Sequence, residues 1–548
     1  SGKSCIPASV PMQSLRYEAD VVIVGGGLAG LVTALELLEK NRRVVLLDRD
    51  EPERLGGLAR ESFGGVFLVD TPHQRRLRIQ DSPELAWSDW QRCARFGSED
   101  HWPRRWAQLY CERSIPLIFE FLDRLGVRFL PLVNWPERGL YEPLNSVPRW
   151  HIAWGTGYEI ATRVIAALEA HPNRHRLALH FRHAVTDFVV EGGRVVGVVG
   201  QVEPDGPDFE ARGAAVVVAS GGICGGDLSR VRAHWYRPWG EPPRKLLNGA
   251  HRYADGLLHD RAAALGAHVT HLDLQWHYAA GVHHPARRRP DDGLSLVPPR
   301  SALWCNAHGR RIGPPPLVGY TDTRWLVEQV LRQPGQYSWL VLNYKIAVRE
   351  LAVSGCDYME AFRYKKRLRM LWELVRGNHR LVRRLIDECP DDFVVADTSE
   401  ALIDGMNARS LFGLQIDGEG MLRDIQAYDA MIARGPAFFN DEQLRRLMNF
   451  RTYRADRLRL CRFQPILDPK ARPLIAIRCF ILTRKSLGGL KTNLEGQVLR
   501  SDDTPIPGLY AVGEAAGFGG GGIHGRGSLE GTFLGGCILT ARTTARHL

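Results

Sequence analysis

Several signatures of other protein classes are missing from this sequence of 548 residues. Its ten cysteines are scattered, with no CxxC motif and no paired spacing, so we expect free thiols in a reducing, cytoplasmic compartment. The apolar run nearest the N-terminus is interrupted by glycines 25–27, and we interpret it as a strand and a helix rather than a membrane span. Residues 1–16 lack the basic start and apolar run of a signal peptide, and we expect them to form a flexible tail.

Signatures of nucleic-acid binding, hydrolysis and nicotinamide binding are missing too. The net charge of +11 would suit nucleic acid or a membrane surface. However, the arginines are spread over helical segments such as 363–369 and 376–384, without a nucleic-acid-binding motif. We therefore expect no nucleic-acid partner and leave an anionic substrate or redox partner open. There is no Gly-x-Ser-x-Gly elbow. Since only one convincing Gly-x-Gly-x-x-Gly occurs, we predict no separate NAD(P)H domain.

The length requires two or more domains. Composition is typical of a soluble globular protein, with 44% hydrophobic and 24% charged residues. The hydrophobic patterns predict helices over 82–126, 159–171, 325–333, 344–352, 358–389 and 441–449, a hairpin of strands 179–190 and 194–199, and a strand over 214–219. Residues 223–480 hold half of the Trp and most of the His and Arg and are interpreted as an insertion between 17–222 and 481–548, which share an α/β style.

A glycine-rich turn follows an apolar strand at residues 20–24 and leads into an Ala/Leu-rich helix. Gly25 permits the tight turn, Gly27 allows a pyrophosphate to approach the backbone, and Gly30 lets helix and strand pack closely. A second apolar run ends at Asp48, which is placed to accept hydrogen bonds from a ribose. The helix N-terminus offers free N–H groups to phosphates. This βαβ unit therefore predicts dinucleotide binding.

A second glycine-rich block lies near the C-terminus. An apolar strand at 509–512 runs into Gly513-Glu514, and a helix opens near Gly531. With these two blocks the chain resembles the FAD-dependent fumarate reductase/succinate dehydrogenase flavoprotein and 3-ketosteroid dehydrogenase superfamily. The resemblance implies an α/β, Rossmann-like FAD domain of the two-dinucleotide-binding type, with an inserted α+β cap domain at 223–480. It also implies that Glu514 bonds the ribityl chain and that the helix N-terminus faces the flavin.

The resemblance implies FAD as the cofactor, which we expect to be non-covalent because no histidine can be placed for covalent attachment. Its predicted contacts are Gly25, Gly27, Leu28, Ala29, Gly30, Asp48, Arg49, Gly56, Gly57, Leu58, Ser62, Gly64, Gly65, Val185, Ala219, Ser220, Gly221, Gly513, Glu514, Gly531, Thr532 and Leu534.

The family's substrate-binding pattern is only partly present. Lys485 stands where fumarate-type members carry the histidine of His-Thr-Met-Gly-Gly, and Ser528 stands near their clamping arginine, so a small dicarboxylate is disfavoured. Candidate catalytic residues are Arg324, Arg484, Lys485, His524, which could titrate near neutrality, and Tyr278, with Tyr320 as an alternative tyrosine. Each also has a structural interpretation, such as Arg324 at a helix start capped by Asp322. The histidines at 271–284 lack ligand spacing, so no metal is predicted.

These residues favour a dehydrogenase or reductase that transfers a hydride between flavin N5 and a C–C/C=C bond of a bulky, ketone-like and steroid-like small molecule, because the cap is rich in Trp and Tyr. A flavin-dependent amine or alcohol oxidase, a non-redox isomerase or hydratase, and a basic binding module are the alternatives. The substrate, direction, oligomeric state and electron acceptor or donor (quinone, dioxygen or redox protein) stay open.

Overall fold

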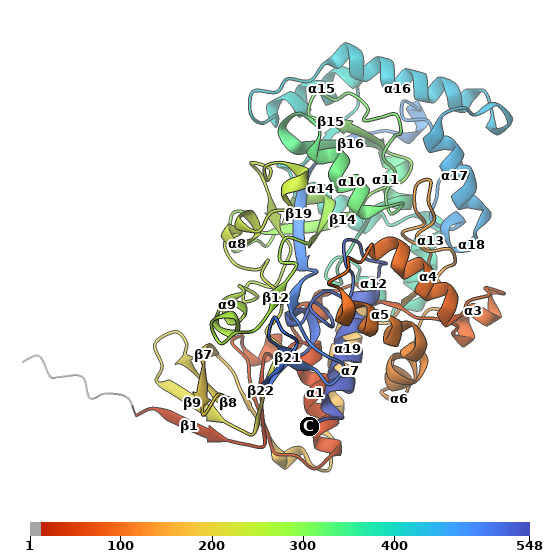
Figure 1. Ribbon diagram of the computed structural model, residues 1–548. Helices are drawn as coiled ribbons and strands as arrows, with labels where there is room; N and C mark the ends of the chain where they lie inside the picture. The colour runs from red at the N-terminus through yellow and green to blue at the C-terminus, as the bar shows by residue number, and fades with distance from the viewer. Residues whose placement is uncertain (1–12) are drawn as a thin grey trace, which may run out of the picture.

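The computed structural model describes residues 13–548 as two lobes, with strand β1 (Leu15–Glu18) and the C-terminus in the lower one (Figure 1). Residues 1–12 of the expected tail lie outside the described residues. The tail was predicted to extend to residue 16, but strand β1 (Leu15–Glu18) already pairs in parallel with β9 (Asp208–Arg212). The backbone pairing of Leu15 with Phe209 therefore corrects the end of the tail.

The lower lobe is built on a six-stranded sheet. Its order is β21 (Gln497–Leu499), β22 (Pro505–Ala511), β10 (Ala215–Val218), β2 (Val21–Val24), β3 (Val44–Leu47) and β6 (Leu177–His180). All pairs are parallel except β21 with β22. Val24 pairs with Leu47 and Val218, and Val218 pairs with Ala511, so four strands end at one edge of the sheet. Ligands of such folds bind at this carboxyl edge.

Alternate residues of the central strands pack into different layers. Ile23 belongs to the same buried cluster as residues of helices α1 (Leu28–Glu39), α7 (Thr156–Glu169) and α19 (Thr532–Ala545), while Val22 belongs to a cluster with residues of a four-stranded sheet. That sheet has the order β1, β9, β8 (Arg194–Val202) and β7 (His183–Glu191). The hairpin of β7 and β8 is confirmed. The strand predicted over 179–190 is two strands, because the chain turns at Arg182 (φ 58°) and β6 joins the parallel sheet.

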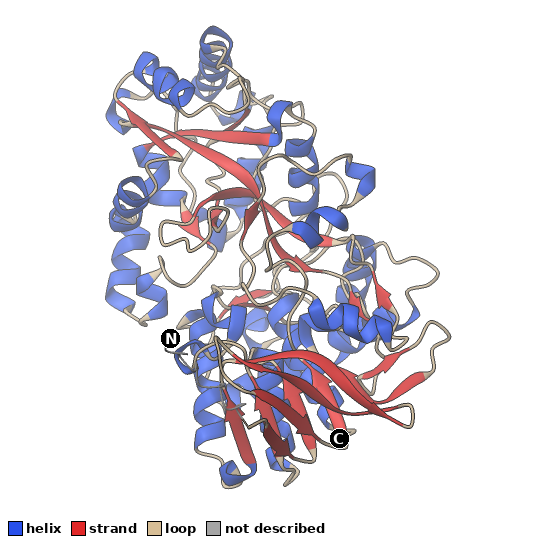
Figure 2. Cartoon of the chain, turned by 90° about the vertical axis from the view of Figure 1, so that its left-hand side faces the viewer, coloured by secondary structure: helices blue, strands red, loops and turns tan. Residues whose placement is uncertain are grey.

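The upper lobe contains a second, mostly antiparallel sheet. Its order is β15 (Leu303–Asn306), β16 (Tyr337–Asn343), β19 (Leu474–Ser486), β13 (Gln275–His283), β14 (Gly293–Val297) and β17 (Ala352–Val353), with β11 (Leu247–Asn248) and β18 (Phe393–Ala396) also pairing with β19. Figure 2 shows these strands above the sheets of the lower lobe. Because β19 is continuous through residue 480, the predicted boundary there falls inside a strand that links the lobes.

Helices surround the upper sheet. They are α8 (Ser229–Ala233), α10 (Thr323–Leu331), α11 (Tyr344–Glu350), α12 (Glu360–Arg363), α13 (Arg367–Arg376), α14 (His379–Glu388), α15 (Ser399–Ala408), α16 (Gly418–Ala433), α17 (Glu442–Thr452) and α18 (Arg454–Arg457). Helix α9 (Leu257–Ala264) packs instead against β7 of the lower lobe. The single helix predicted over 358–389 is instead α12, α13 and α14. The chain breaks at Lys365 (φ 55°) and Gly377 (φ 92°), which adopt left-handed backbone conformations.

Smaller elements complete the lower lobe. They are α2 (Gly57–Glu61), α3 (Pro72–Arg76), α4 (Pro83–Ala94), α5 (His101–Ser114), a π-helical turn (Ile115–Phe119), α6 (Glu120–Arg124) and the strand pairs β4 (Gly65–Phe67) with β5 (Trp150–Ile152) and β12 (Val269–Thr270) with β20 (Gly489–Leu490). The helical region predicted over 82–126 thus contains three helices and a π-turn, with a break between α4 and α5.

Candidate active site

Of the three key glycines in the turn after β2, only one has open space beside it for a ligand. A Cβ on Gly25 (φ 111°) would lie 2.2 Å from the Ala219 carbonyl oxygen, and one on Gly30 would lie 1.9 Å from the Gly25 carbonyl oxygen. A Cβ on Gly27 would meet nothing within 4 Å. Gly27 is also the N-cap of α1, whose first turn holds no acid and no side-chain cap. This open space beside free N–H groups fits a pyrophosphate.

Asp48 borders the same turn. It follows β3, and its carboxylate would lie 2.4 Å from a Cβ on the adjacent Gly26. Burial raises the pKa of Asp48, while the backbone N–H of Asp50 donates to its Oδ1 at 3.1 Å. The position of Asp48 at the carboxyl edge suits a ribose hydroxyl.

Glu514 also lies at the carboxyl edge of the six-stranded sheet, just after β22 ends. Its Oε1 accepts a hydrogen bond of 2.8 Å from the backbone N–H of Ser486, at the end of β19. Burial raises the pKa of Glu514 to about 7. A Cβ on Gly222 would lie 2.4 Å from the Glu514 carboxylate, so a larger residue at position 222 would collide with this carboxylate. The carboxylate and the open glycine turn together suit a cofactor that carries both a polyhydroxyl chain and a pyrophosphate.

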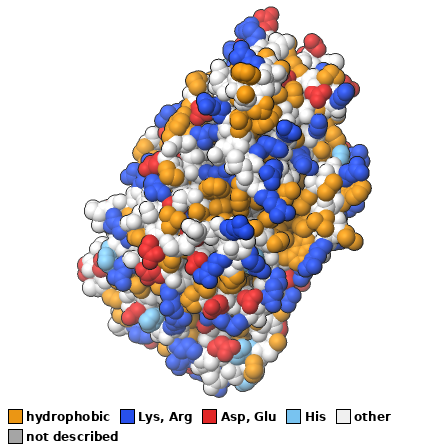
Figure 3. Space-filling view, turned by 90° about the vertical axis from the view of Figure 1, so that its right-hand side faces the viewer, with side chains coloured by type: hydrophobic (Ala, Val, Ile, Leu, Met, Phe, Trp, Pro, Cys, Tyr) orange, Lys and Arg blue, Asp and Glu red, His pale blue; other side chains and the backbone are white. Residues whose placement is uncertain are grey.

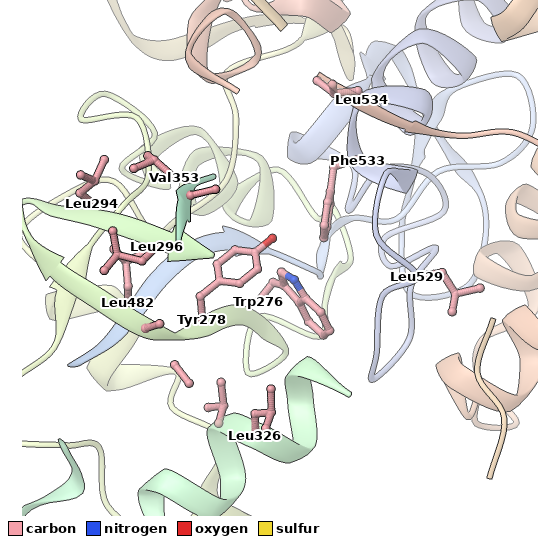
Figure 4. Close-up of a cluster of buried hydrophobic side chains, with 14 of the residues drawn as sticks. Trp276, Tyr278, Leu294, Leu296, Leu326, Val353, Leu482, Leu529, Phe533 and Leu534 are labelled. Atoms are coloured by element: carbon pink, nitrogen blue, oxygen red, sulfur yellow. The ribbon is translucent and has the colours of Figure 1, made fainter. Parts of the chain in front are cut away.

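A polar cluster lies one residue further back along β19. Lys485 Nζ donates to the Tyr278 hydroxyl at 3.3 Å, and this hydroxyl donates to Glu530 Oε1 at 2.9 Å. The indole N–H of Trp276 donates to the same oxygen at 3.2 Å. In Figure 4, Trp276 and Tyr278 extend from β13 toward Phe533 in the first turn of α19. A base, a phenol and an ammonium are thus linked in one hydrogen-bonded chain.

Burial sets the protonation of this cluster. It lowers the pKa of Lys485 to about 8, although the Glu530 carboxylate opposes that change. Lys485 Nζ also lies 3.7 Å from the centre of the Phe533 ring, a cation–π contact that favours the ammonium. Burial, together with the charge of Glu530, raises the pKa of Tyr278 well above its usual value. The phenol therefore stays protonated and can donate at neutral pH.

The sequence profile of the FAD binding domain family matches residues 20–534. The chain belongs to this FAD-binding family. Its relatives include a KsdD-like steroid dehydrogenase of Mycobacterium tuberculosis, 40% identical over 551 residues, which cover 96% of this chain and 95% of the relative. The KsdD-like steroid dehydrogenase of Mycolicibacterium smegmatis is 40% identical over 94% of this chain and 96% of its own length. The predicted cofactor, FAD, and the predicted class, an FAD-dependent oxidoreductase, are confirmed.

Solved structures of the same fold support the architecture. The open conformation of a flavocytochrome c3 fumarate reductase superposes with a TM-score of 0.68 at 20% identity, over 97% of this chain and 78% of that one. A 3-ketosteroid delta1-dehydrogenase from Sterolibacterium denitrificans gives 0.66 at 16% identity, over 97% and 99%. These matches confirm the predicted FAD domain with a cap.

The other residues predicted to bind FAD lie at or near the carboxyl edge of the six-stranded sheet. Leu28 and Ala29 begin α1, Gly56, Gly57 and Leu58 lie at the start of α2, Ser220 and Gly221 follow β10, and Gly531, Thr532 and Leu534 lie at the start of α19. Gly56 forms a bridge with Gly27. Ser62, Gly64, Gly65 and Val185 lie between α2 and β4, in β4 and in β7.

Arg49 differs from this group because its side chain already has partners. Its guanidinium bonds Glu203 at 2.9 Å and Asp255 at 3.3 Å and lies over the Tyr253 ring. Those contacts raise the pKa of Arg49 and hold the side chain in place. Its predicted contact with FAD would therefore have to come from the backbone or from a rearranged side chain.

Among the described residues, two predicted catalytic side chains form no hydrogen bond with Lys485, Tyr278 or Glu530, although the His524 ring packs 4.7 Å from that of Phe533. Burial lowers the pKa of His524 to about 3, so the expectation that it titrates near neutrality is wrong; its Nε2 bonds the Thr532 hydroxyl at 2.7 Å. Arg324 lies between the rings of Tyr236 and Trp239, on α10, which Asp322 caps as expected. Their catalytic roles stay predictions.

Arg484 neighbours Lys485 on β19, where successive side chains point to opposite faces. Within residues 13–548, Arg484 forms no hydrogen bond or ion pair. Its charge nevertheless acts on the hydroxyls of Tyr278 and Tyr320. It is therefore a cation near the cluster that is available to a ligand.

Sequence reasoning missed Glu530. The residue lies in the glycine-rich C-terminal block, directly before Gly531. The available signal was an acid among apolar and small residues directly before the helix at Gly531. Glu530 is 9% exposed and accepts from two side chains of β13, which only the fold brings to it.

One group with ligand-like spacing lies elsewhere. Glu99, Asp100 and His271 have ligand atoms within 4.8 Å of one another. A 2.6 Å ion pair between His271 Nε2 and Asp100 Oδ1 accounts for this proximity and raises the pKa of His271. We assign no metal to it.

Proposed function

We propose that this FAD-dependent oxidoreductase dehydrogenates or reduces a C–C/C=C bond next to the carbonyl of a bulky, steroid-like ketone. The observation that carries the proposal is the chain of Lys485, Tyr278 and Glu530 hydrogen bonds among the rings of Trp276 and Phe533. The 40% identity to KsdD-like steroid dehydrogenases supports the substrate class. When bound, FAD exchanges the hydride.

Tyr278 exchanges the proton in this proposal. In the dehydrogenation direction, its hydroxyl oxygen takes a proton from the carbon beside the carbonyl, while its own proton passes to Glu530 Oε1 along the 2.9 Å hydrogen bond. Reduction reverses both transfers. Such a relay needs no free phenolate, which burial makes costly at this position. Lys485 keeps positive charge 3.3 Å from the reacting oxygen and stabilises negative charge that develops there.

The test is an anaerobic titration of the purified protein with a panel of ketosteroids and simpler enones, followed by flavin absorbance. We expect bleaching or reoxidation of the flavin with steroid ketones and little change with fumarate. If fumarate alone exchanges electrons with the flavin, the proposed substrate class is wrong. Hydrogen peroxide formation from amines or alcohols, without steroid turnover, would support an oxidase instead.

The pH dependence of kcat/KM should report Lys485. Because its pKa is about 8, the ammonium is lost as pH rises through that value. We expect kcat/KM to fall about tenfold between pH 7 and pH 9. Lys485→Arg keeps the charge over this range and should remove the alkaline fall, at some loss of activity at pH 7. An unchanged fall near pH 8 in Lys485→Arg would assign it to another group.

Location and partners belong to the same proposal. The nine cysteines among the described residues are unpaired, which supports a reducing, cytoplasmic location. Among residues 13–548, no helix combines the length and apolar character that a transmembrane segment needs. We infer that FAD is held without covalent attachment and that a quinone, dioxygen or a redox protein accepts or supplies the electron pair that balances the substrate reaction. The division of the chain at 222 and 480 remains a prediction.

A further inference from the structure

Helix α13 turns its apolar side to solvent. Leu368, Leu371, Trp372 and Val375 recur at helical spacing, and their exposed fractions are 84%, 54%, 63% and 72%. None of the helix residues is buried. Stripes of this spacing normally face a protein core. This exposed apolar stripe is therefore unusual on a helix that belongs to a folded lobe.

The other side of α13 is held by polar contacts. Arg369 Nε bonds Glu373 at 3.0 Å, and its Nη1 bonds Glu360 of α12 at 3.1 Å. Arg349 Nη1 donates to the Leu374 carbonyl oxygen at 2.8 Å. The polar side is thus fixed to the protein, so the apolar stripe cannot rotate inward without breaking these bonds.

Cationic residues surround the stripe. Exposed Lys366 and Arg367 stand at the N-terminal end of α13, and exposed Arg376 and Arg383 follow at its C-terminal end. Two further exposed cations are paired: Lys365 with Glu159 at 2.9 Å and Arg380 with Glu360 at 3.7 Å. The acids within α12 and α13, Glu360 and Glu373, are already paired with Arg369. Figure 3 shows the corresponding side of the molecule, where hydrophobic side chains gather in the middle and Lys and Arg lie around them.

We propose that this surface, the α13 face (residues 364–376 with Arg380 and Arg383), docks on an anionic lipid bilayer. A helix with Trp and Leu on one side and flanking Lys and Arg lies in the interface, with its apolar side in the acyl boundary and its cations at the headgroups. Ten residues span about 15 Å, enough to lie on a bilayer but not to cross it.

The charges argue against a second copy of this chain as the occupant. A two-fold contact through the α13 face would bring each cationic rim against its own copy. Like charges set against each other disfavour association. An anionic bilayer meets both features of the face at once. The docking does not depend on the proposed steroid substrate and goes beyond the proposed function.

The experiment is co-sedimentation of the FAD-loaded protein with vesicles, without substrate. We expect binding to vesicles of phosphatidylcholine and phosphatidylglycerol at low salt, and weaker binding to phosphatidylcholine alone. Leu371→Ser/Trp372→Ser should reduce the partition coefficient roughly tenfold or more, because it removes most of the inserted apolar surface. Lys366→Glu/Arg367→Glu should reduce the partition coefficient at least about fivefold for each charge, and only on anionic vesicles.

Matched controls keep the result specific. Phe438→Ser removes an apolar side chain that is 70% exposed elsewhere on the upper lobe, and Arg42→Glu/Arg546→Glu reverses two exposed charges on the lower lobe. Both controls should bind vesicles like the parent protein, and flavin absorbance should be the same in every variant. The proposal is overturned if the parent does not sediment with anionic vesicles, if the α13 variants bind equally well, or if light scattering shows a dimer that Leu371→Ser/Trp372→Ser dissociates.

Discussion

Tyr278→Phe should lower kcat/KM for a steroid ketone by about 10²–10⁴-fold, the usual contribution of a positioned proton-transfer group. The substitution keeps the ring that packs beside Trp276, so the fold should be retained. It removes the hydroxyl that joins Lys485 to Glu530. Steady-state kinetics and the anaerobic rate of flavin reduction measure the loss, and an unchanged FAD content shows that it is chemical.

Tyr320→Phe is the matched control for this prediction. Tyr320 is a partly buried tyrosine of this region, but its hydroxyl lies 3.3 Å from the Ser354 hydroxyl and forms no hydrogen bond with Glu530. We expect a change of less than about tenfold. Glu530→Gln should fall between the two, because the amide still accepts from Tyr278 but takes a proton poorly. If Tyr320→Phe loses the activity and Tyr278→Phe keeps it, the proton-transfer role belongs to Tyr320 rather than to Tyr278.

The FAD edge was predictable because its signals are local. The strand before Gly25, the helix after it and the acid at Asp48 lie within thirty residues. The structure shows a steric reason for glycine at Gly25 and Gly30, and open space beside Gly27. The distant Glu514 was recognised because strand, glycine and acid occur together in its own segment. Parallel pairing then aligned these segments at one edge.

The proton-transfer cluster was only partly predictable. Tyr278 and Lys485 were candidates by their position near the family's motifs, and the pairing of β13 with β19 brings them together. Glu530 becomes their partner only because the segment before α19 folds against β13. His524 illustrates the opposite failure: its segment indicated the right region, yet burial decides its protonation. Helical periodicity over 358–389 was real, but it did not reveal the turns at Lys365 and Gly377 or that one stripe faces solvent.

Gly27→Val should weaken FAD binding about 100-fold or more while leaving the stability of the FAD-free protein nearly unchanged. The backbone of Gly27 (φ −74°, ψ −178°) is extended and open to any residue, and its Cβ would meet nothing within 4 Å. The fold alone therefore does not require glycine here; the cofactor does. A 100-fold loss corresponds to about 2.7 kcal/mol of binding free energy. FAD titration and urea unfolding of the FAD-free protein measure the two effects.

Gly30→Ala provides the contrast. Its Cβ would lie 1.9 Å from the Gly25 carbonyl oxygen, so α1 must move away from the end of β2 even without a ligand. We expect a lower free energy of unfolding for the FAD-free protein as well as weaker FAD binding. Equal FAD affinity for Gly27→Val and the parent would contradict the placement of the pyrophosphate at the N-terminus of α1. A destabilised FAD-free Gly27→Val would instead mean that glycine serves the fold at this position, as it does at Gly30.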